Sequence, residues 1–409
     1  MRLRIIRRKP IEKPILHRLD PIQTVVPFNN KNILIIAAEN SAENYAAQVV
    51  DEFQRNNPAV KFFGVGGDKL AQRGVDIIIS NNDLAVVGII EVVSSLFKLS
   101  RYMNRLFREA LARKADAVLL IDYPDFNLRM AKKLKKAGIR VYYYISPTVW
   151  AWRYSRVNII KKYVDHLFII FPFEIPIYQK ENIPFTYIGH PLVPAIQIKR
   201  SKETVRKDLN VSSNELLLTL LPGSRTSEVN FLLPNMLAAV DGLRKEFPIR
   251  IALLKADNID PELLASYLKT VSFDIRVINQ AEGYDLIHAS DVIITTCGTS
   301  NLEIAMLGVP FTAVYRVNKL SYFLGKRFVK IDLYSIINIL AGKEVIKELI
   351  QRNYTVENIV DEVRRILNNP DVQSQMKNDF LAIKQMLTQD MDPPGLIYKE
   401  ISTYFFEKK

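Results

Sequence analysis

Cysteine and histidine are scarce in this chain. Its 409 residues contain one cysteine, Cys297, and four scattered histidines. One cysteine excludes an internal disulfide framework and fits a reducing compartment, and no Cys/His spacing typical of a metal site occurs. We therefore expect neither a disulfide scaffold nor a bound metal.

Long apolar runs and glycine-rich nucleotide loops are also missing. No stretch reaches the roughly 18 uninterrupted apolar residues of a transmembrane helix. The first expected strand-to-helix turn, Ala37 to Ala42, lacks the dinucleotide fingerprint, and Gly64-x-Gly66-Gly67 lies on another turn. A Walker-type Gly-Lys-Ser/Thr loop is absent too. These absences argue against nicotinamide, flavin and P-loop chemistry, and we expect no cofactor.

Acidic residues are outnumbered, and the net charge of +13 is uneven. Residues 1–18 carry seven Lys or Arg against Glu12 alone, which gives +6 (7 − 1). This segment lacks the apolar core of a secretory signal, and it fits a disordered arm, a contact with anionic lipid or an organellar transit peptide. Because nearly half of the excess charge lies there and no recognised module is present, we expect no nucleic-acid partner.

The body of the chain alternates apolar strands with amphipathic helices. With 48% hydrophobic and 24% charged residues it has the composition of a globular protein, and its length predicts two domains. We predict α/β architecture with two Rossmann-like domains facing across a cleft. The domains are a basic extension (1–31), an N-terminal domain (32–192) and a C-terminal domain with C-terminal helices (193–409). The predicted strands are Ile33–Ala37, Lys61–Val65, Ala117–Ile121, Arg140–Ile145, His166–Ile170, Leu216–Leu221, Ile249–Leu254, Asp274–Ile278, Val292–Thr295 and Phe311–Val314.

Two carboxylates follow the predicted strand Ala117–Ile121. Asp122 and Asp125 flank Pro124, and the periodic segment Leu128 to Lys136 predicts a helix after them. Ligands of open α/β sheets bind beyond the carboxyl ends of the strands, so a carboxylate here can act as a general base. It can equally orient a sugar hydroxyl or cap the following helix.

Two turns of the second domain suit phosphate. Gly223-Ser224-Arg225 follows an apolar strand, and glycine, outward backbone N–H groups and an arginine together make an anion site. Gly298-Thr299 opens another helix that carries Glu303, which can accept both hydroxyls of a ribose. The alternatives are ordinary capped turns in which Arg225 is solvated and Glu303 complements the helix dipole. Two such turns together favour a nucleotide-diphosphate pocket.

Three further features have both a functional and a structural interpretation. Residues 86–99 are apolar and lead into basic residues, which is typical of an interfacial helix, although a buried core helix also fits. Trp150, after a predicted strand, can wall a sugar or acyl pocket or anchor the core. His190 can face the cleft near the predicted hinge or serve a structural role.

Taken together, these segments resemble the lipid-A-disaccharide synthases, inverting glycosyltransferases of the GT-B architecture. The resemblance covers roughly residues 32 to 385, and its motifs occur in the family's order. They are Phe63-Gly64-Val65-Gly66-Gly67, Val86 to Val92, Ile121-Asp122-Tyr123-Pro124-Asp125-Phe126-Asn127, Ser146 to Arg153, Ile188-Gly189-His190-Pro191, Leu221-Pro222-Gly223-Ser224-Arg225, Gly298 to Glu303 and Asn338 to Gly342.

This resemblance implies a substrate pair and a set of roles. The family joins UDP-2,3-diacylglucosamine to 2,3-diacylglucosamine 1-phosphate through a β-1,6 linkage and releases UDP. It implies Asp122 as the base with Asp125 beside it, and contacts to the nucleotide sugar from Gly223, Ser224, Arg225, Gly298, Thr299, Glu303 and Asn338. Acceptor contacts are expected from Glu39, Ser41, Asn127, Trp150 and His190. It also implies a metal-independent reaction, contact of residues 86–99 with the cytoplasmic face of the inner membrane, and a homodimer.

One segment departs from the family pattern. The usual Gly-Glu-x-Ser-Gly-Asp is replaced by Ala38-Glu39-Asn40-Ser41-Ala42-Glu43. Since alanine resists positive φ, we expect a loop of different shape. The alternatives are a GT-B transferase with another acceptor, a UDP-sugar 2-epimerase, and a catalytically silent relative that binds UDP-sugar or lipid.

Overall fold

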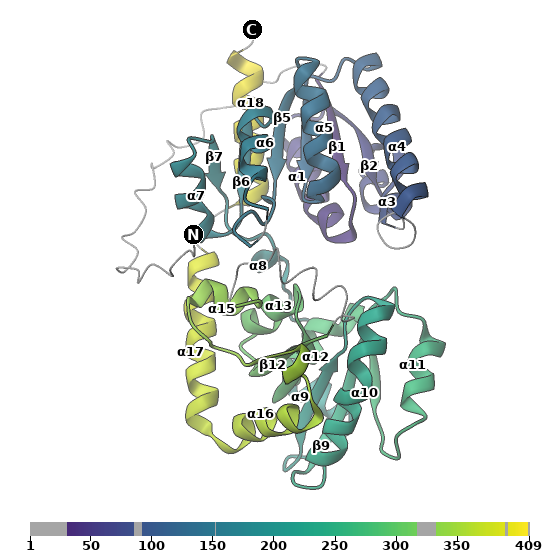
Figure 1. Cartoon of the computed structure of the whole chain (residues 1–409), viewed down its shortest axis with the longest axis vertical. Helices are drawn as coiled ribbons and strands as arrows, with labels where there is room; N and C mark the ends of the chain where they lie inside the picture. The colour runs from purple at the N-terminus through teal and green to yellow at the C-terminus, as the bar shows by residue number, and fades with distance from the viewer. Residues whose placement is uncertain (1–30, 86–91, 152, 317–332, 389–391, 408–409) are drawn as a thin grey trace.

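Two parallel sheets organise the chain. The computed structural model describes residues 31–85, 92–151, 153–316, 333–388 and 392–407. The first sheet has the order β3-β2-β1-β4-β5-β6-β7 and the second β10-β9-β8-β11-β12-β13 (Figure 1). In each sheet the order reverses beside the first strand, as in Rossmann-like folds. The predicted α/β class with two Rossmann-like domains is confirmed.

The first sheet is apolar on both faces because helices cover both. Alternate residues of β1 point to opposite sides: Leu34 and Ile36 pack with α4, α5 and α6, whereas Ile33 and Ile35 pack with α1. Its strands are β1 (Asn32–Ala37), β2 (Lys61–Gly66), β3 (Asp76–Ser80), β4 (Ala117–Ile121), β5 (Arg140–Tyr144), β6 (His166–Ile169) and β7 (Phe185–Tyr187). Its helices are α1 (Asn40–Asn56), α2 (Asp68–Ala71), α3 (Asn81–Ala85), α4 (Val92–Ala112), α5 (Pro124–Lys136), α6 (Arg156–Tyr163) and α7 (Ile175–Lys180).

The second sheet is built the same way around one large apolar core. Its strands are β8 (Leu216–Leu221), β9 (Ile249–Lys255), β10 (Arg276–Asn279), β11 (Val292–Thr296), β12 (Phe311–Tyr315) and β13 (Glu348–Ile350). The helices that follow β7 are α8 (Leu192–Ala195), α9 (Lys202–Asp208), α10 (Thr226–Leu243), α11 (Pro261–Leu268), α12 (Gly283–Ala289), α13 (Ser300–Met306), α15 (Ile336–Ala341), α16 (Val356–Asn368), α17 (Pro370–Leu387) and α18 (Pro393–Glu407).

The last helix, α18, belongs to a different domain from the one predicted. We expected all of 193–409 in the second domain, but α18 packs on α1 of the first (Figure 1). Tyr398 meets Phe53 edge-on with 4.8 Å between ring centroids, and Glu400 lies 3.2 Å from His166. Apolar residues of α18 complete the first core, which explains why the chain crosses back. The boundary at 192/193 lies between the last strand of one sheet and the first of the other.

Candidate active site

Asp122 stands at the carboxyl end of β4 on a strained turn. Asp122 and Tyr123 both have left-handed backbone conformations, with φ of 49° and 46°. The Asp122 carbonyl accepts hydrogen bonds from Asn127 Nδ2 and the Tyr143 hydroxyl, each at 2.7 Å, and its N–H donates to Tyr144 O at 2.9 Å. Non-glycine residues in this region cost about 1–3 kcal/mol, and such strain persists where surrounding contacts hold it. These contacts therefore hold the turn that carries the Asp122 carboxylate.

The carboxylate of Asp122 is mostly buried beside another acid. The pKa of Asp122 is raised to about 6, mainly by burial and then by the charge of Glu39, while a hydrogen bond from the Tyr123 N–H lowers it in part. Glu39 follows β1, the neighbour of β4 in the sheet. A carboxylate with this pKa is ionised at neutral pH and is a stronger base than an ordinary aspartate.

Asp125 occupies a different setting from its predicted partner. Helix α5 begins at Pro124, four residues earlier than predicted, because proline suits the first helical position. Asp125 is therefore in the first helical turn, exposed, and ion-paired with Arg156 at 2.5 Å and Arg153 at 3.1 Å. Asn127 is fully buried and contacts the backbone of Ile121 and Asp122. Asn127 therefore holds the backbone of Asp122 through its Nδ2, and a direct contact with the acceptor stays a prediction.

The first turn of the chain has an ordinary backbone. Neither Ala38 nor Ala42 has positive φ, as alanine prefers, and a loop of different shape from the family's stays a prediction. Glu39 and Ser41 are exposed at the start of α1. Glu43 is buried and its carboxylate accepts from the backbone N–H groups of Gly67, Lys69 and Leu70 and from Asn81. The longer glutamate thus ties α1 to the start of α2.

Glu303 of the second domain, on α13, is a second carboxylate in a setting with tyrosines. Tyr284 donates to Glu303 at 3.1 Å, and burial raises the pKa of Glu303. The Tyr45 phenol of α1 is close enough to both acids that, after burial, the charges of Glu303 and Asp122 further raise its pKa. Tyr45, Tyr143 and Tyr284 were not predicted, and no motif in the sequence marks them. The pKa of Tyr45 is therefore affected by one carboxylate from each domain.

The turn between β8 and α10 differs from its prediction in one respect. Ser224 and Arg225 are exposed, as an anion site requires. Their backbone N–H groups are not open, however, because both donate to Glu228 Oε2 at 3.0 and 3.2 Å. Gly223 has φ of 113°, and a Cβ there would stand 2.4 Å from the same oxygen. Gly298 and Thr299 are exposed before α13, and the Thr299 side chain makes no capping hydrogen bond.

Asn338 does not have the exposure that a nucleotide contact needs. It is fully buried in α15, and its amide oxygen accepts from Val345 N at 2.7 Å and Ile346 N at 3.0 Å. Its amide nitrogen donates to Ile346 O at 2.9 Å and Glu348 Oε1 at 2.8 Å. All four hydrogen bonds of this side chain are made within the protein, so the predicted direct contact with UDP is not supported. We infer that it shapes the loop before β13.

This structural role gives a measurable expectation. Replacing Asn338 with alanine leaves two buried backbone N–H groups and a carbonyl without partners, which costs about 2–4 kcal/mol of unfolding free energy. Urea denaturation measures this, with the exposed Asn368→Ala on α16 as a control. Unchanged stability with weaker UDP binding would instead restore the direct contact.

Trp150 and His190 belong to an aromatic row near the connection between the sheets. Trp150 meets Phe173 edge-on at 5.1 Å, Phe173 stacks on Phe171 at 5.2 Å, and Phe171 contacts His190 at 5.2 Å. His190 is buried, which lowers its pKa to about 3, and its Nδ1 accepts from Leu192 N. A buried histidine with this pKa, whose Nδ1 already accepts a hydrogen bond, is a weak base at neutral pH. The Trp150 indole N–H is buried and has no hydrogen-bond acceptor in the described part of the chain.

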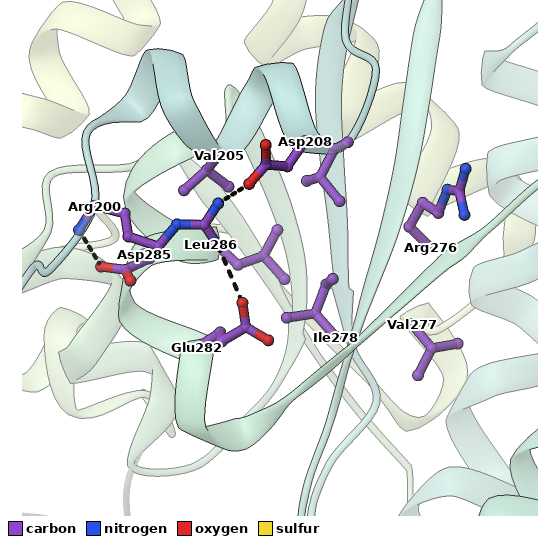
Figure 2. Close-up of a pocket in the computed structure, with 10 residues that line it drawn as sticks. Arg200, Val205, Asp208, Arg276, Val277, Ile278, Glu282, Asp285 and Leu286 are labelled. Atoms are coloured by element: carbon purple, nitrogen blue, oxygen red, sulfur yellow. Dashed lines mark hydrogen bonds and ion pairs between the residues drawn. The ribbon is translucent and has the colours of Figure 1, made fainter.

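A hollow of about 320 Å³ lies away from these residues, between α9, α12 and β10. Figure 2 shows the Arg200 guanidinium between Asp208 and Glu282, while the backbone N–H groups of Lys199 and Arg200 donate to the buried Asp285. None of the predicted site residues lines it. These contacts fix the linker to the second domain and are structural.

The described residues contain no group of three or more His, Cys, Asp or Glu arranged to hold a metal ion. No described helix combines the length and apolar character needed to cross a bilayer. Metal independence stays a prediction.

Comparison with solved structures identifies the fold. The chain superimposes on a putative UDP-N-acetylglucosamine 2-epimerase from Listeria monocytogenes with a TM-score of 0.65 and 13% identity, covering 93% of this chain and 97% of that one. For the calicheamicin glycosyltransferase CalG4 the TM-score is 0.57 at 13% identity, covering 92% and 98%. At such identities the likeness concerns the fold alone, which is that of GT-B glycosyltransferases and 2-epimerases.

Comparison of sequences is more specific. Residues 33–392 match the family model described as lipid-A-disaccharide synthetase. Lipid-A-disaccharide synthase of Geobacter sulfurreducens is 35% identical over 356 residues, covering 87% of this chain and 92% of that protein. The Syntrophus aciditrophicus synthase is 37% identical over 362 residues, covering 88% and 94%. The chain therefore belongs to the lipid-A-disaccharide synthase family of glycosyltransferases.

Proposed function

We propose that this protein transfers a diacylglucosaminyl group from UDP-2,3-diacylglucosamine to the 6-hydroxyl of 2,3-diacylglucosamine 1-phosphate. The observation that carries the proposal is Asp122, a partly desolvated carboxylate on a strained turn, whose charge acts on the same tyrosine, Tyr45, as the charge of Glu303 in the second domain. Family membership supports the choice of substrates. The setting of Asp122 supports its role as the base.

The chemistry assigned to Asp122 is proton removal. Its carboxylate takes the proton of the acceptor 6-hydroxyl as that oxygen attacks the anomeric carbon from the face opposite UDP. The new β-1,6 bond forms as the bond to the diphosphate oxygen breaks, which inverts the anomeric centre. Asn127 and Tyr143 hold the Asp122 backbone in position during the step.

The second domain binds the donor in this proposal. Glu303 accepts the ribose hydroxyls, and Arg225 together with the start of α10 stabilises the charge that develops on the leaving diphosphate. Gly298 and Thr299 border the same nucleotide. This division of labour needs no metal ion.

The decisive assay measures UDP release from UDP-2,3-diacylglucosamine in detergent with EDTA, with and without the acylated 1-phosphate acceptor. We expect acceptor-dependent release that EDTA does not reduce. Turnover of UDP-N-acetylglucosamine to its 2-epimer, or transfer to a non-acylated sugar, would favour the epimerase or another transferase. UDP binding without any turnover would favour a catalytically silent relative.

The membrane contact is proposed for the first turns of α4. Residues 86–91 lie outside the described residues, but Phe97 on α4 is 76% exposed and is followed by exposed Lys98, Arg101, Arg105 and Arg108. An exposed aromatic beside cations suits the interface of an anionic bilayer. We propose peripheral association with the cytoplasmic face of the inner membrane, where both acylated substrates are embedded.

Phe97 provides the test of this surface. Phe97→Asp removes exposed apolar area and adds a charge of the wrong sign, so we expect vesicle binding to weaken about tenfold with little change in thermal stability. Flotation with phosphatidylglycerol vesicles measures binding, and Leu381→Asp, at an exposed leucine of α17, is the control. Equal losses in both variants would argue against a local surface. The homodimer stays a prediction that sedimentation can test.

A further inference from the structure

Glu228 occupies the donors that the predicted diphosphate site offers. Its Oε2 accepts from the backbone N–H groups of Ser224 and Arg225 at 3.0 and 3.2 Å. Its Oε1 accepts from the Arg225 guanidinium at 2.9 Å. The Glu228 side chain is only 11% exposed, whereas that of Arg225 is 66% exposed. One carboxylate therefore contacts two backbone N–H groups of this turn and the Arg225 guanidinium.

The same donors would serve a phosphate oxygen of the donor substrate. A diphosphate and a carboxylate are both anions that bind planar guanidinium groups and backbone N–H groups. If both were present on these three donors, two anions would lie within a few ångströms of each other, which is electrostatically unfavourable. Gly223 brings the carboxylate close, since any side chain at that position would collide with it.

We propose that Glu228 is an internal competitor of the donor diphosphate, which leaves the Ser224 and Arg225 donors when the nucleotide binds. The inference rests on the proposed function, because it takes the Gly223–Arg225 turn as the diphosphate site. In this inference Glu228 sets the affinity for the donor without touching its sugar. Glu228 lowers the affinity for UDP, and exchange of anions on Arg225 accompanies each donor binding and each UDP release.

A purely structural role makes the opposite prediction. A glutamate three residues after the N-cap commonly accepts from the N-cap N–H and stabilises the helix start. If Glu228 only ordered the turn, neutralising it would loosen Arg225 and weaken UDP binding. The two roles therefore differ in the sign of the change in affinity.

The experiment compares the dissociation constant for UDP in wild type and Glu228→Gln by calorimetry at low ionic strength. The amide keeps the shape and one acceptor but removes the charge, so we expect UDP to bind about threefold to tenfold more tightly. Glu262→Gln removes the same charge from the exposed start of α11 and should leave the affinity within twofold. Thermal melting verifies that each variant is folded.

The outcomes separate this inference from the proposed function. Wild type that does not bind UDP contradicts the proposed function itself. Wild type that binds UDP, with equal or weaker binding in Glu228→Gln, overturns only the competitor role. A structure of the wild-type protein with UDP gives a second test that needs no variant. Retention of the contacts from Ser224 N and Arg225 N to Glu228 in that structure would also overturn the inference.

Discussion

Asp122→Asn is expected to reduce kcat by about 10²–10⁴-fold, the contribution of a general base, while UDP affinity stays within about twofold. The amide cannot take the proton of the acceptor hydroxyl. UDP binds through the second domain, and the charge lost from the first does not contact it in our proposal. Steady-state UDP release and calorimetric UDP binding, measured on the same preparations, give the two numbers.

Asparagine is the informative replacement because of the backbone. It tolerates left-handed φ better than other non-glycine residues, so the turn at φ 49° is retained. Stability should not fall either. The pKa of Asp122 is raised from its ordinary value of 3.8 to about 6 in the folded protein. Its ionisation therefore lowers the free energy of unfolding as the pH rises from 3.8 towards 6. Removing that charge relieves the cost at neutral pH.

The same pKa predicts the shape of the pH profile. Because the ionised carboxylate is the base, kcat/KM should fall about tenfold per unit below pH 6 and level off above pH 7. The Glu39 charge contributes to the raised pKa, so Glu39→Gln should move the acidic limb to lower pH. A limb that does not move, or that persists in Asp122→Asn, would assign the titration to another group.

Asp125→Asn is the matched control. Its carboxylate is exposed and already paired with Arg153 and Arg156, so we expect a loss below tenfold. If Asp125→Asn removes activity and Asp122→Asn does not, the base has been assigned to the wrong carboxylate.

The sequence predicted the strands well and the side-chain environments poorly. Ten strands were expected within two residues of their observed ends because buried parallel strands are continuous apolar runs such as Ala117–Ile121. The edge strands β3, β7 and β13 were missed. Three residues, as in β7 and β13, carry little periodic signal, whereas β3 is as long as the predicted β4. The return of α18 to the first domain was missed too, because its apolar face does not say which core it completes.

Motif residues behave differently once their surroundings are known. Asp122 and Glu303 are partly buried and Arg225 is exposed, whereas Asn338 and Asn127 are fully buried and hold backbone in place. A sequence motif contains both kinds of residue, because replacing an accessible residue or a buried one that holds the backbone damages the site equally. Tyr45 and Tyr284 could not have been predicted, since only the folded chain brings α1 and α12 close to Glu303 of α13.

Arg225→Ala is expected to lower kcat/KM for the donor by about 10²-fold, near the lower end of what a lost charge-stabilising contact costs in an active site. In the structure Arg225 is 66% exposed and pairs only with Glu228 among the described contacts, a surface ion pair worth about 0–1 kcal/mol. Stability should therefore change little, and the loss should appear in donor binding and turnover.

Two further variants make this prediction specific. Arg225→Lys keeps the charge but not the planar donor pair, so it should recover only part of the activity. Arg244→Ala removes an exposed arginine just beyond the far end of α10, where it pairs with Asp241, and should leave kcat/KM within twofold. Similar losses in Arg225→Ala and Arg244→Ala would indicate a general effect of positive charge. A loss confined to Arg225, combined with tighter UDP binding in Glu228→Gln, would mean that one guanidinium exchanges an internal carboxylate for the leaving diphosphate in every turnover.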